Sequence, residues 1–347
     1  MISPQSPDPQ LAEWPTEGLE RVTRCPICDD ERRTLLHREL RDRIFFVAPG
    51  SWDRWRCAGC ASGYLDPRPD PASIGLAYGT YYTHTAPPPI AATGSVARLR
   101  NALGNGYRNW RFGTDLKPAL AVGRWLVPLM PLTHERIEVI YRRLPRKAAE
   151  PHRMLDIGCG NGAFLALARD AGWDVTGVEP DAVAREVAAR TGATVVETLA
   201  ELADTPAAFG YICLNHVIEH LHDPVATLRQ CHALLAPGGM LYIDTPNIEA
   251  LGHDLYGPDW RGLEPPRHLV IFSRAGMELA LREAEFTNID FVPQRDALPV
   301  MLHQSARIAA RRDPYLDSAI SPKMAKGNPF RDPDRAEFLT LTGNKPK

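Results

Sequence analysis

The sequence predicts an α/β fold in which helices cover both faces of a mostly parallel sheet. Three observations support this class. Short apolar segments alternate with helical segments from residue 153 onward, and a glycine-rich turn directly follows the first of them. Two C-x2-C pairs near the N-terminus indicate a separate small module. The alternation is typical of a parallel sheet, and a length of 347 residues leaves room for a second domain.

The strands and helices of the main domain can be placed along the chain. We expect strands at residues 153–157, 173–179, 193–197, 210–215, 239–244, 287–293 and 336–344. We expect helices at residues 162–171, 181–191, 223–236 and 274–285. Ligands of such sheets bind beyond the carboxyl ends of the strands, so candidate site residues are sought there.

The chain is expected to divide into four consecutive parts. These are a disordered lead (1–20), a cysteine-bearing module expected to bind zinc (21–75), a helical cap or insert (76–145) and the main domain (146–347). Within the insert, the apolar stretch from 118 to 132 is expected to be buried, and contact with a membrane surface is the alternative.

Composition excludes several classes of protein. A net charge of −2 and a pI near 6.6 lack the basic excess of a dedicated nucleic-acid binder. The sequence has no apolar run of the roughly 20 residues that a membrane span requires. The proline-rich, polar N-terminus does not resemble a signal peptide. We therefore expect a cytoplasmic protein whose seven cysteines serve as thiols and metal ligands.

A glycine-rich turn and two acidic residues indicate a binding site for an adenosine-bearing cofactor. Gly158, Gly160 and Gly162 follow the strand at 153–157, and the absence of Cβ atoms lets the main chain bend tightly against a ligand. Asp156 lies just before the turn. Glu179 ends the next strand about 20 residues further on, the spacing at which a carboxylate can hold ribose hydroxyls.

Two cofactors compete for this turn. The pattern Gly158-x-Gly160-x-x-Ala163 fits the dinucleotide fingerprint, which makes an NAD-linked oxidoreductase the first alternative. However, an NAD turn places a pyrophosphate at the helix N-terminus, and the Asp156 carboxylate would repel that anion. The same carboxylate suits the ammonium and sulfonium charges of S-adenosylmethionine.

Further motifs in the same order favour S-adenosylmethionine. The glycine turn and Glu179 are followed by Asn215–Pro224 and then by Leu235–Met240. Over residues 146–347 this ordered set resembles the class I S-adenosylmethionine-dependent methyltransferases, closest to the bacterial sugar, polysaccharide and quinone methyltransferases. The resemblance implies a Rossmann-like, seven-stranded sheet whose last strand is antiparallel. The chain departs from that branch at Phe209-Gly210-Tyr211, where the branch usually has Phe-Asp.

The resemblance also implies a set of cofactor-binding residues. These are Asp156, Gly158, Cys159, Gly160, Gly162, Glu179, Pro180, Thr198, Leu199, Asn215 and His216. In the same loop Glu219 or His220 would face the methyl acceptor. His216–His220 also matches the H-x-x-E-H pattern of some zinc proteases, but His216 directly follows an apolar strand instead of lying within a long helix. The alternative for each histidine is a residue that only caps or packs the loop.

His268 is the first candidate for a general base. It follows the fifth predicted strand and a long loop, and look-alike methyltransferases carry a histidine here before an aromatic-Ser pair. The catalytic candidates are therefore His268, His220 and Glu219. The alternative for His268 is a helix-entry histidine bonded to the backbone. Arg267 can hold an acceptor phosphate or carboxylate, and Ser273 is expected to be a helix N-cap.

Four cysteines near the N-terminus predict a structural zinc site. Cys25 and Cys28 form the first C-x2-C pair, and 28 residues separate it from the pair Cys57 and Cys60. Such pairs can hold one Zn²⁺ in a closed tetrahedral site, which stabilises a fold but leaves no position for substrate. Redox-active or unrelated thiols are the alternative. The sugar C-methyltransferases are similar here too, since they carry an N-terminal zinc-binding domain with paired cysteines.

The helical insert supplies further candidates. Tyr81, Tyr82 and His84 are expected to close over the substrate. Arginines on its helices can receive a diphosphate, although a solvated face is the commoner arrangement; they are Arg98, Arg100, Arg108 and Arg111.

Together these patterns predict S-adenosylmethionine-dependent methyl transfer to a small molecule, such as a nucleotide-linked sugar or a related biosynthetic intermediate, with a structural Zn²⁺ and without a nucleic-acid partner. The alternatives are the NAD-linked oxidoreductase and a zinc-knuckle protein that binds or modifies RNA. The oligomeric state and the acceptor atom stay open.

Overall fold

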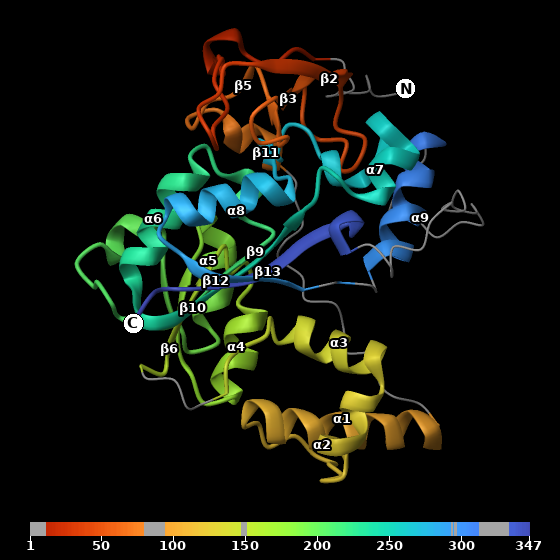
Figure 1. Ribbon diagram of the computed structural model, residues 1–347, viewed down its shortest axis with the longest axis vertical. Helices are drawn as coiled ribbons and strands as arrows, with labels where there is room; N and C mark the ends of the chain where they lie inside the picture. The colour runs from red at the N-terminus through yellow and green to blue at the C-terminus, as the bar shows by residue number, and fades with distance from the viewer. Residues whose placement is uncertain (1–11, 80–93, 147–150, 293, 295–296, 312–332) are drawn as a thin grey trace, which may run out of the picture.

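The computed structural model describes residues 12–79, 94–146, 151–292, 294, 297–311 and 333–347. Three parts lie one after another along the long axis of the molecule (Figure 1). The N-terminal module is at one end, the main α/β domain is in the middle, and the helical insert is at the other end.

The main domain contains the predicted seven-stranded sheet. Its strands are β6 (Arg153–Ile157), β7 (Asp174–Val178), β8 (Thr194–Val196), β9 (Phe209–Asn215), β10 (Leu235–Pro246), β12 (Thr287–Val292) and β13 (Phe338–Asn344). They are ordered β12-β13-β10-β9-β6-β7-β8, and β13 runs antiparallel to both of its neighbours. Four helices match the predicted ones: α4 (Ala163–Asp170), α5 (Ala182–Ala189), α6 (Pro224–Leu234) and α8 (Arg274–Glu283). The Rossmann-like methyltransferase fold expected from the sequence is thus confirmed.

The central strands are apolar on both faces because helices cover both faces. On β9, Ile212 and Leu214 belong to one hydrophobic core, whereas Tyr211 and Cys213 belong to the other. This alternation follows from the two-residue period of a strand. Because both faces of these strands are buried, polar side chains can gather only at the ends of the strands.

The N-terminal module is joined to the main domain by a shared sheet. Its strands β2 (Arg33–Leu40), β3 (Trp52–Cys57) and β4 (Gly63–Leu65) pair with β11 (Val270–Ile271), which comes from the main domain. A second, two-stranded sheet joins β1 (Leu19–Glu20) to β5 (Arg68–Pro69).

The expectation of a disordered lead over residues 1–20 is wrong for residues 12–20. Trp14 is 5% exposed and contacts Trp52 edge-to-face at 5.2 Å, so burial of its ring fixes this segment to the module. The segment is rich in proline and polar residues, and this composition did not reveal that Trp14 attaches it to the module.

Two helices were not predicted. Helix α7 (Leu251–Tyr256) lies in the stretch expected as a long loop, and α9 (Ala297–Ala309) lies between the last two strands of the sheet. Helix α7 is short. The two helices pack against each other. Among the described residues, no helix is long and apolar enough to cross a bilayer.

The insert is mainly helical in its described part, with α1 (Ser95–Phe112), α2 (Gly123–Leu126) and α3 (Pro131–Ile140). The expectation that residues 118–132 are buried is wrong for all of their large apolar side chains except Val127, which is 1% exposed. Trp125 is 65% exposed, Leu129 is 77% exposed and Leu132 is 62% exposed. Only Val127 of this stretch buries a large side chain, in a core that it shares with Tyr107 and Phe112 of α1. Elsewhere the stretch packs its backbone against α1. A Cβ atom on Gly106 of α1 would lie only 1.8 Å from the carbonyl oxygen of Leu120.

Candidate active site

The glycine-rich turn between β6 and α4 has the shape of a ligand cradle. Gly158, Gly160 and Gly162 all have positive φ angles, of 68°, 54° and 78°. A Cβ atom on Gly158 would lie 2.5 Å from Val217, whereas a Cβ atom on Gly160 would meet nothing within 4 Å. The backbone at Gly160 therefore faces open space, as a bound cofactor requires.

Asp156, at the end of β6, is the buried anion of this cradle. Its Oδ1 accepts a hydrogen bond from Nη1 of Arg142 at 2.6 Å, and its buried Oδ2 has no hydrogen-bond partner among the described residues. Burial raises the pKa of Asp156 to about 6, although the Arg142 guanidinium opposes that shift. An acid with a spare oxygen beside an arginine fits the ammonium and carboxylate groups of an amino acid, such as the methionine end of S-adenosylmethionine.

Glu179 follows β7 and lies across the turn from the glycines. Its two carboxylate oxygens accept backbone N–H groups of Gly160, at 2.8 Å, and of Asp181, at 3.0 Å. The side chain is half-exposed. The carboxylate is thus fixed at the carboxyl edge of the sheet, where the sequence spacing placed a ribose-binding acid.

The other predicted cofactor residues lie along the same edge. Pro180 follows Glu179 and is exposed; Thr198 caps a short 3₁₀ helix that begins at Leu199; and Asn215 ends β9. Cys159 is different, because its Sγ points into the core, where it would lie 2.6 Å from a Cβ atom on Gly177. Only the backbone of Cys159 belongs to the cradle.

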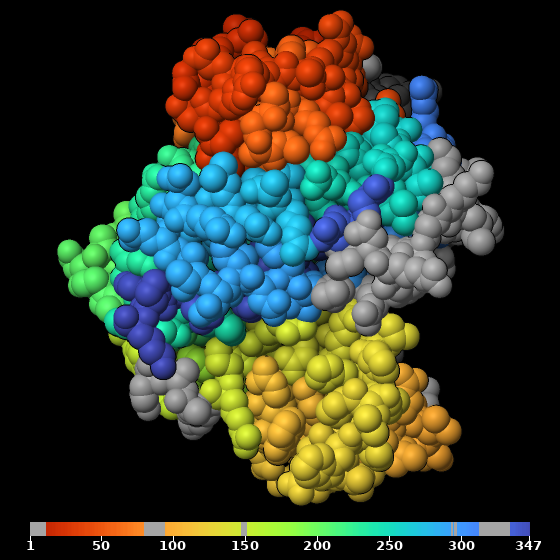
Figure 2. Space-filling model, viewed as in Figure 1, coloured from red at the N-terminus to blue at the C-terminus, as the bar shows by residue number. Residues whose placement is uncertain are grey.

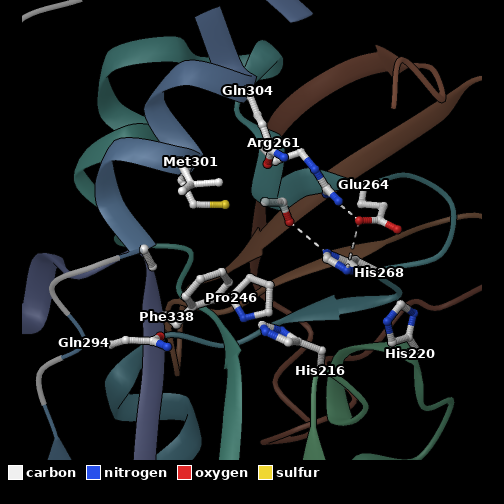
Figure 3. A pocket seen from close by; sticks show the side chains of 13 residues that line it. His216, His220, Pro246, Arg261, Glu264, His268, Gln294, Met301, Gln304 and Phe338 are labelled. Carbon is white, nitrogen blue, oxygen red and sulfur yellow. Dashed lines mark hydrogen bonds and ion pairs between the residues drawn. The ribbon is translucent and has the colours of Figure 1, made fainter. Parts of the chain in front are cut away.

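Beside this edge a cavity of about 470 Å³ opens under α9 (Figure 3). Apolar side chains of Pro246, Met301 and Phe338 form one side, and His268 and Glu264 lie on the other. The full lining is His216, His220, Pro246, Arg261, Gly262, Glu264, His268, Gln294, Ala297, Val300, Met301, Gln304 and Phe338.

His268 lies in this cavity with a defined tautomer. Its Nδ1 is 2.8 Å from the carbonyl oxygen of Gly262, which can only accept, so Nδ1 carries the proton and Nε2 keeps its lone pair. Nε2 lies 3.7 Å from a Glu264 oxygen and 4.0 Å from a Glu219 oxygen. Burial lowers the pKa of His268 to about 3, so the imidazole is neutral at physiological pH. A neutral imidazole with a free Nε2 lone pair can accept a proton, and Glu264 and Glu219 offset part of the cost that burial places on the imidazolium.

Glu219 and His220, the other two catalytic candidates, lie next to His268. Glu219 is fully buried and accepts a hydrogen bond from the Thr245 hydroxyl at 2.9 Å. Burial would raise the pKa of Glu219, but His216 and the neighbouring histidines hold it at about 2. Nδ1 of His220 is 3.0 Å from the Arg267 carbonyl oxygen and 3.0 Å from the Tyr78 hydroxyl. One ligand atom from each of Glu219, His220 and His268 lies within 4.8 Å of the others, so this cluster can also hold a cation.

His216 lies on the wall of the acceptor-sized cavity. It has a positive φ angle of 55°, and its ring lies 3.5 Å from Glu219 and 3.7 Å from Asp244. Burial lowers the pKa of His216, but the two carboxylates outweigh burial and raise it. His216 follows the end of β9 and His220 lies in a 3₁₀ turn, Ile218–His220, so the pair does not have the helical arrangement of a zinc protease.

The expectation that Arg267 holds an acceptor anion is wrong. Its side chain is fully buried, and its guanidinium donates to both oxygens of Asp42, to Glu264 and to the Ala77 carbonyl. Arg267 is thus a structural link between the N-terminal module and the loop that carries His268. Arg261, by contrast, lines the cavity and pairs with Glu264.

The four paired cysteines come together in the N-terminal module. The Sγ atoms of Cys25 and Cys60 are 3.6 Å apart, and those of Cys28 and Cys57 are 3.4 Å apart. All four lie within 4.8 Å of one another. A tetrahedron with Zn–S bonds of about 2.3 Å has S···S edges of about 3.8 Å, so the arrangement fits a Cys₄ metal site.

Other predictions have mixed outcomes. Ser273 is the N-cap of α8, because its hydroxyl accepts the Gly276 N–H at 2.9 Å. The insert arginines do not form one anion site, because Arg111 pairs with Glu138 at 3.0 Å while Arg98 and Arg100 are exposed. Tyr81, Tyr82 and His84 lie outside the described residues.

Several site residues were missed by the sequence analysis. Arg142 and Glu264 contact predicted residues directly, and Gln294, Met301 and Phe338 complete the cavity. Glu264 had a local signal, because it lies four residues before His268 in the same loop. Nothing local distinguishes Arg142 from the other arginines of the insert.

Comparisons with known proteins identify the family of the main domain. Residues 132–290 match a family model described as a methyltransferase domain. A ubiquinone biosynthesis O-methyltransferase of Xylella fastidiosa is 36% identical over 221 residues, covering 56% of this chain and 83% of the relative. The same enzyme of Xanthomonas euvesicatoria is 34% identical over 128 residues, which are 35% of this chain and 52% of the relative. Like this second match, several others span only about half of the relative's length.

Among solved structures, a Haemonchus contortus phosphoethanolamine N-methyltransferase in complex with phosphomonomethylethanolamine and S-adenosylhomocysteine is 18% identical, with a TM-score of 0.46 over 82% of this chain and 63% of that one.

The main domain has the features of a class I methyltransferase domain. These are a seven-stranded sheet with an antiparallel last strand, a glycine cradle after β6, and the buried Asp156 beside that cradle. With the family match and the relative in Xylella fastidiosa, the chain belongs to the S-adenosylmethionine-dependent methyltransferase family.

Proposed function

We propose that this protein transfers a methyl group from S-adenosylmethionine to a hydroxyl oxygen on an aromatic small molecule of the quinone-precursor type. The observation that carries the proposal is the neutral, oriented imidazole of His268 in a cavity that has one apolar and one polar side. The relatives named for ubiquinone biosynthesis O-methylation support this acceptor class. They give no support to a nucleotide-linked sugar, to an NAD-linked oxidoreductase or to an RNA-binding protein.

The cavity walls suit an aromatic ring. Pro246, Met301 and Phe338 offer an apolar surface on which a ring can lie, and His268 and Glu264 face it from the opposite side (Figure 3). A hydroxyl on that ring would then point toward the imidazole. Holding the acceptor in one orientation supplies much of the rate of a displacement reaction, because the reacting atoms must be in line.

The residues around the cradle would hold the cofactor. Asp156 would bind its ammonium group, Arg142 its carboxylate and Glu179 its ribose hydroxyls, while Gly160 leaves room for the adenosine side. When bound, S-adenosylmethionine supplies an electrophilic methyl group on a positively charged sulfonium.

His268 would remove the proton of the acceptor hydroxyl. Its Nε2 lone pair accepts that proton, and Nδ1 donates to Gly262 throughout, so the ring keeps its position. The resulting imidazolium lies 3.7 Å from Glu264 and 4.0 Å from Glu219, and both carboxylates stabilise its charge. The acceptor oxygen is thereby made a better nucleophile.

We also propose that the Cys₄ cluster binds one structural Zn²⁺ per chain. The S···S distances fit a closed tetrahedral site, and the four-cysteine cluster is also attached to the main domain. The hydroxyl of Ser273, the N-cap of α8, donates to the Cys60 carbonyl. Because the four positions are all thiols, the ion would stabilise structure and take no part in methyl transfer.

The acceptor class can be tested with isotopically labelled S-adenosylmethionine. We expect labelled methyl to appear on a catechol or hydroxybenzoate carrying an alkyl side chain, and the same ring with its hydroxyls already methylated serves as the matched control. A nucleotide-linked sugar is included as a competing acceptor. Methylation of the sugar with none on the phenol would overturn the proposed acceptor.

A further inference from the structure

The helical insert carries a concentrated exposed apolar surface. Among the described residues, fifteen large hydrophobic side chains are exposed, and eleven of them lie between residues 96 and 140. We call the part that follows α1 the apolar tip; it consists of Leu120, Val122, Trp125, Leu126, Leu129, Met130 and Leu132. Figure 2 shows the insert as a lobe at the end of the molecule opposite the N-terminal module. Apolar patches of this kind mark interaction surfaces.

The apolar tip is held in place with its side chains outward. Gly106 and Gly123 let the segment pack backbone against backbone on α1, because Cβ atoms there would lie 1.8 Å and 2.0 Å from the carbonyl oxygens of Leu120 and Leu103. The Leu120 N–H also donates to the Ala102 carbonyl at 2.8 Å.

Two asparagines of α1 complete this attachment. Asn105 donates to the Pro118 carbonyl at 2.9 Å, and Asn109 both donates to the Leu116 carbonyl and accepts its N–H. Backbone groups of Leu116, Pro118 and Leu120 are therefore bonded to α1. The large apolar side chains are exposed because of this architecture, and not because the segment lacks structure.

The charge of the insert has the opposite sign to that of the whole chain. Residues 94–146 contain ten Lys and Arg against three Asp and Glu, although the chain as a whole has a net charge of −2. Arg98, Arg100, Arg124 and Arg136 are exposed. The Arg124 guanidinium lies 5.0 Å from the ring of Trp125, so a basic and an aromatic group share the tip.

We propose that the insert docks on the surface of an anionic lipid bilayer, with the apolar tip entering the headgroup region. Leucine and tryptophan side chains next to arginines are the composition of interfacial membrane-binding segments, in which apolar burial and attraction to anionic lipids add together. The positive charge disfavours a second copy of the insert as the partner, because two such surfaces repel each other. This inference does not depend on the proposed methyl acceptor.

The test uses the full chain and sedimentation with lipid vesicles. We expect binding to vesicles of phosphatidylcholine with phosphatidylglycerol, little binding to phosphatidylcholine alone, and weakening as salt is raised. Trp125→Ser with Leu129→Ser should lower the partition coefficient at least about tenfold, because two exposed apolar anchors are lost. Val183→Ser, which replaces a residue that is 56% exposed on the main domain, is the matched control and should leave binding unchanged.

A second variant separates charge from apolar burial. Arg98→Glu with Arg124→Glu should reduce binding to the anionic vesicles while circular dichroism stays unchanged. Absence of binding to anionic vesicles, or equal binding by the tip variant, would overturn the proposal. A dimer in lipid-free solution that disappears in the tip variant would also overturn it, because the tip would then be a protein interface.

Discussion

Replacing His268 by asparagine is expected to lower kcat by about 10²–10⁴-fold, the usual contribution of a positioned general base. The asparagine amide nitrogen can still donate to the Gly262 carbonyl, as Nδ1 of His268 does, but the variant has no counterpart of Nε2. Binding of S-adenosylmethionine should not change, because His268 belongs to the acceptor cavity and not to the glycine cradle. Methyl transfer under saturating cofactor, together with calorimetric binding of the cofactor, measures both effects.

His253 provides a matched control for this substitution. It is also buried, and its Nδ1 lies 2.6 Å from a backbone carbonyl, that of Ile248, but it does not line the acceptor cavity. His253→Asn should therefore keep kcat within a few-fold of the unmodified protein. If both variants lost activity equally, or if His268→Asn stayed fully active, His268 would not be the general base.

Replacing Cys57 by serine is expected to remove the bound zinc and unfold the N-terminal module. Structural zinc sites in small domains supply about 10–16 kcal/mol of binding free energy, which is more than a small module can lose. The damage should reach the active site for two reasons. β4 of the module pairs with β11, and Asp42 of the module holds Arg267 next to His268. Metal analysis, thermal unfolding and methyl transfer should all report the loss.

Cys231 supplies the matched cysteine substitution. It is fully buried in the main domain and lies outside the four-thiol cluster. Cys231→Ser should retain one zinc per chain and most of the activity, although burial of a hydroxyl lowers its stability somewhat. Full zinc content in Cys57→Ser, or no zinc in the unmodified protein, would rule out the proposed Cys₄ zinc site.

Local patterns were enough to predict most of the fold and the cofactor edge. The apolar strands, the glycine turn, the Asp181 and Asp223 helix starts and the Ser273 cap depend on neighbours within a few residues, so the sequence displays them directly. The order of the motifs then placed Asp156 and Glu179 at the same edge, because consecutive parallel strands end together.

What the sequence could not display are contacts between distant residues. An arginine next to a candidate base is a reasonable candidate for anion binding. The partner of Arg267, Asp42, is 225 positions away in the sequence, so the local pattern could not reveal the pair. The apolar composition of residues 118–132 favoured a buried segment. Gly106 of α1 instead lets the backbone of this stretch pack against the helix, so most of its large side chains face outward. Likewise, no local signal places α9 over the cavity, because helix packing depends on the whole arrangement of the sheet.

The most direct test of the cofactor assignment is calorimetric binding of S-adenosylmethionine, S-adenosylhomocysteine and NAD⁺ to the purified protein. We predict micromolar binding of both sulfur compounds and none of NAD⁺, with S-adenosylmethionine binding lost in Asp156→Asn. In the unmodified protein its affinity should also weaken as the pH falls below about 6, because the raised pKa of Asp156 then leaves the carboxylate protonated. Binding of NAD⁺ without either sulfur compound would contradict the account.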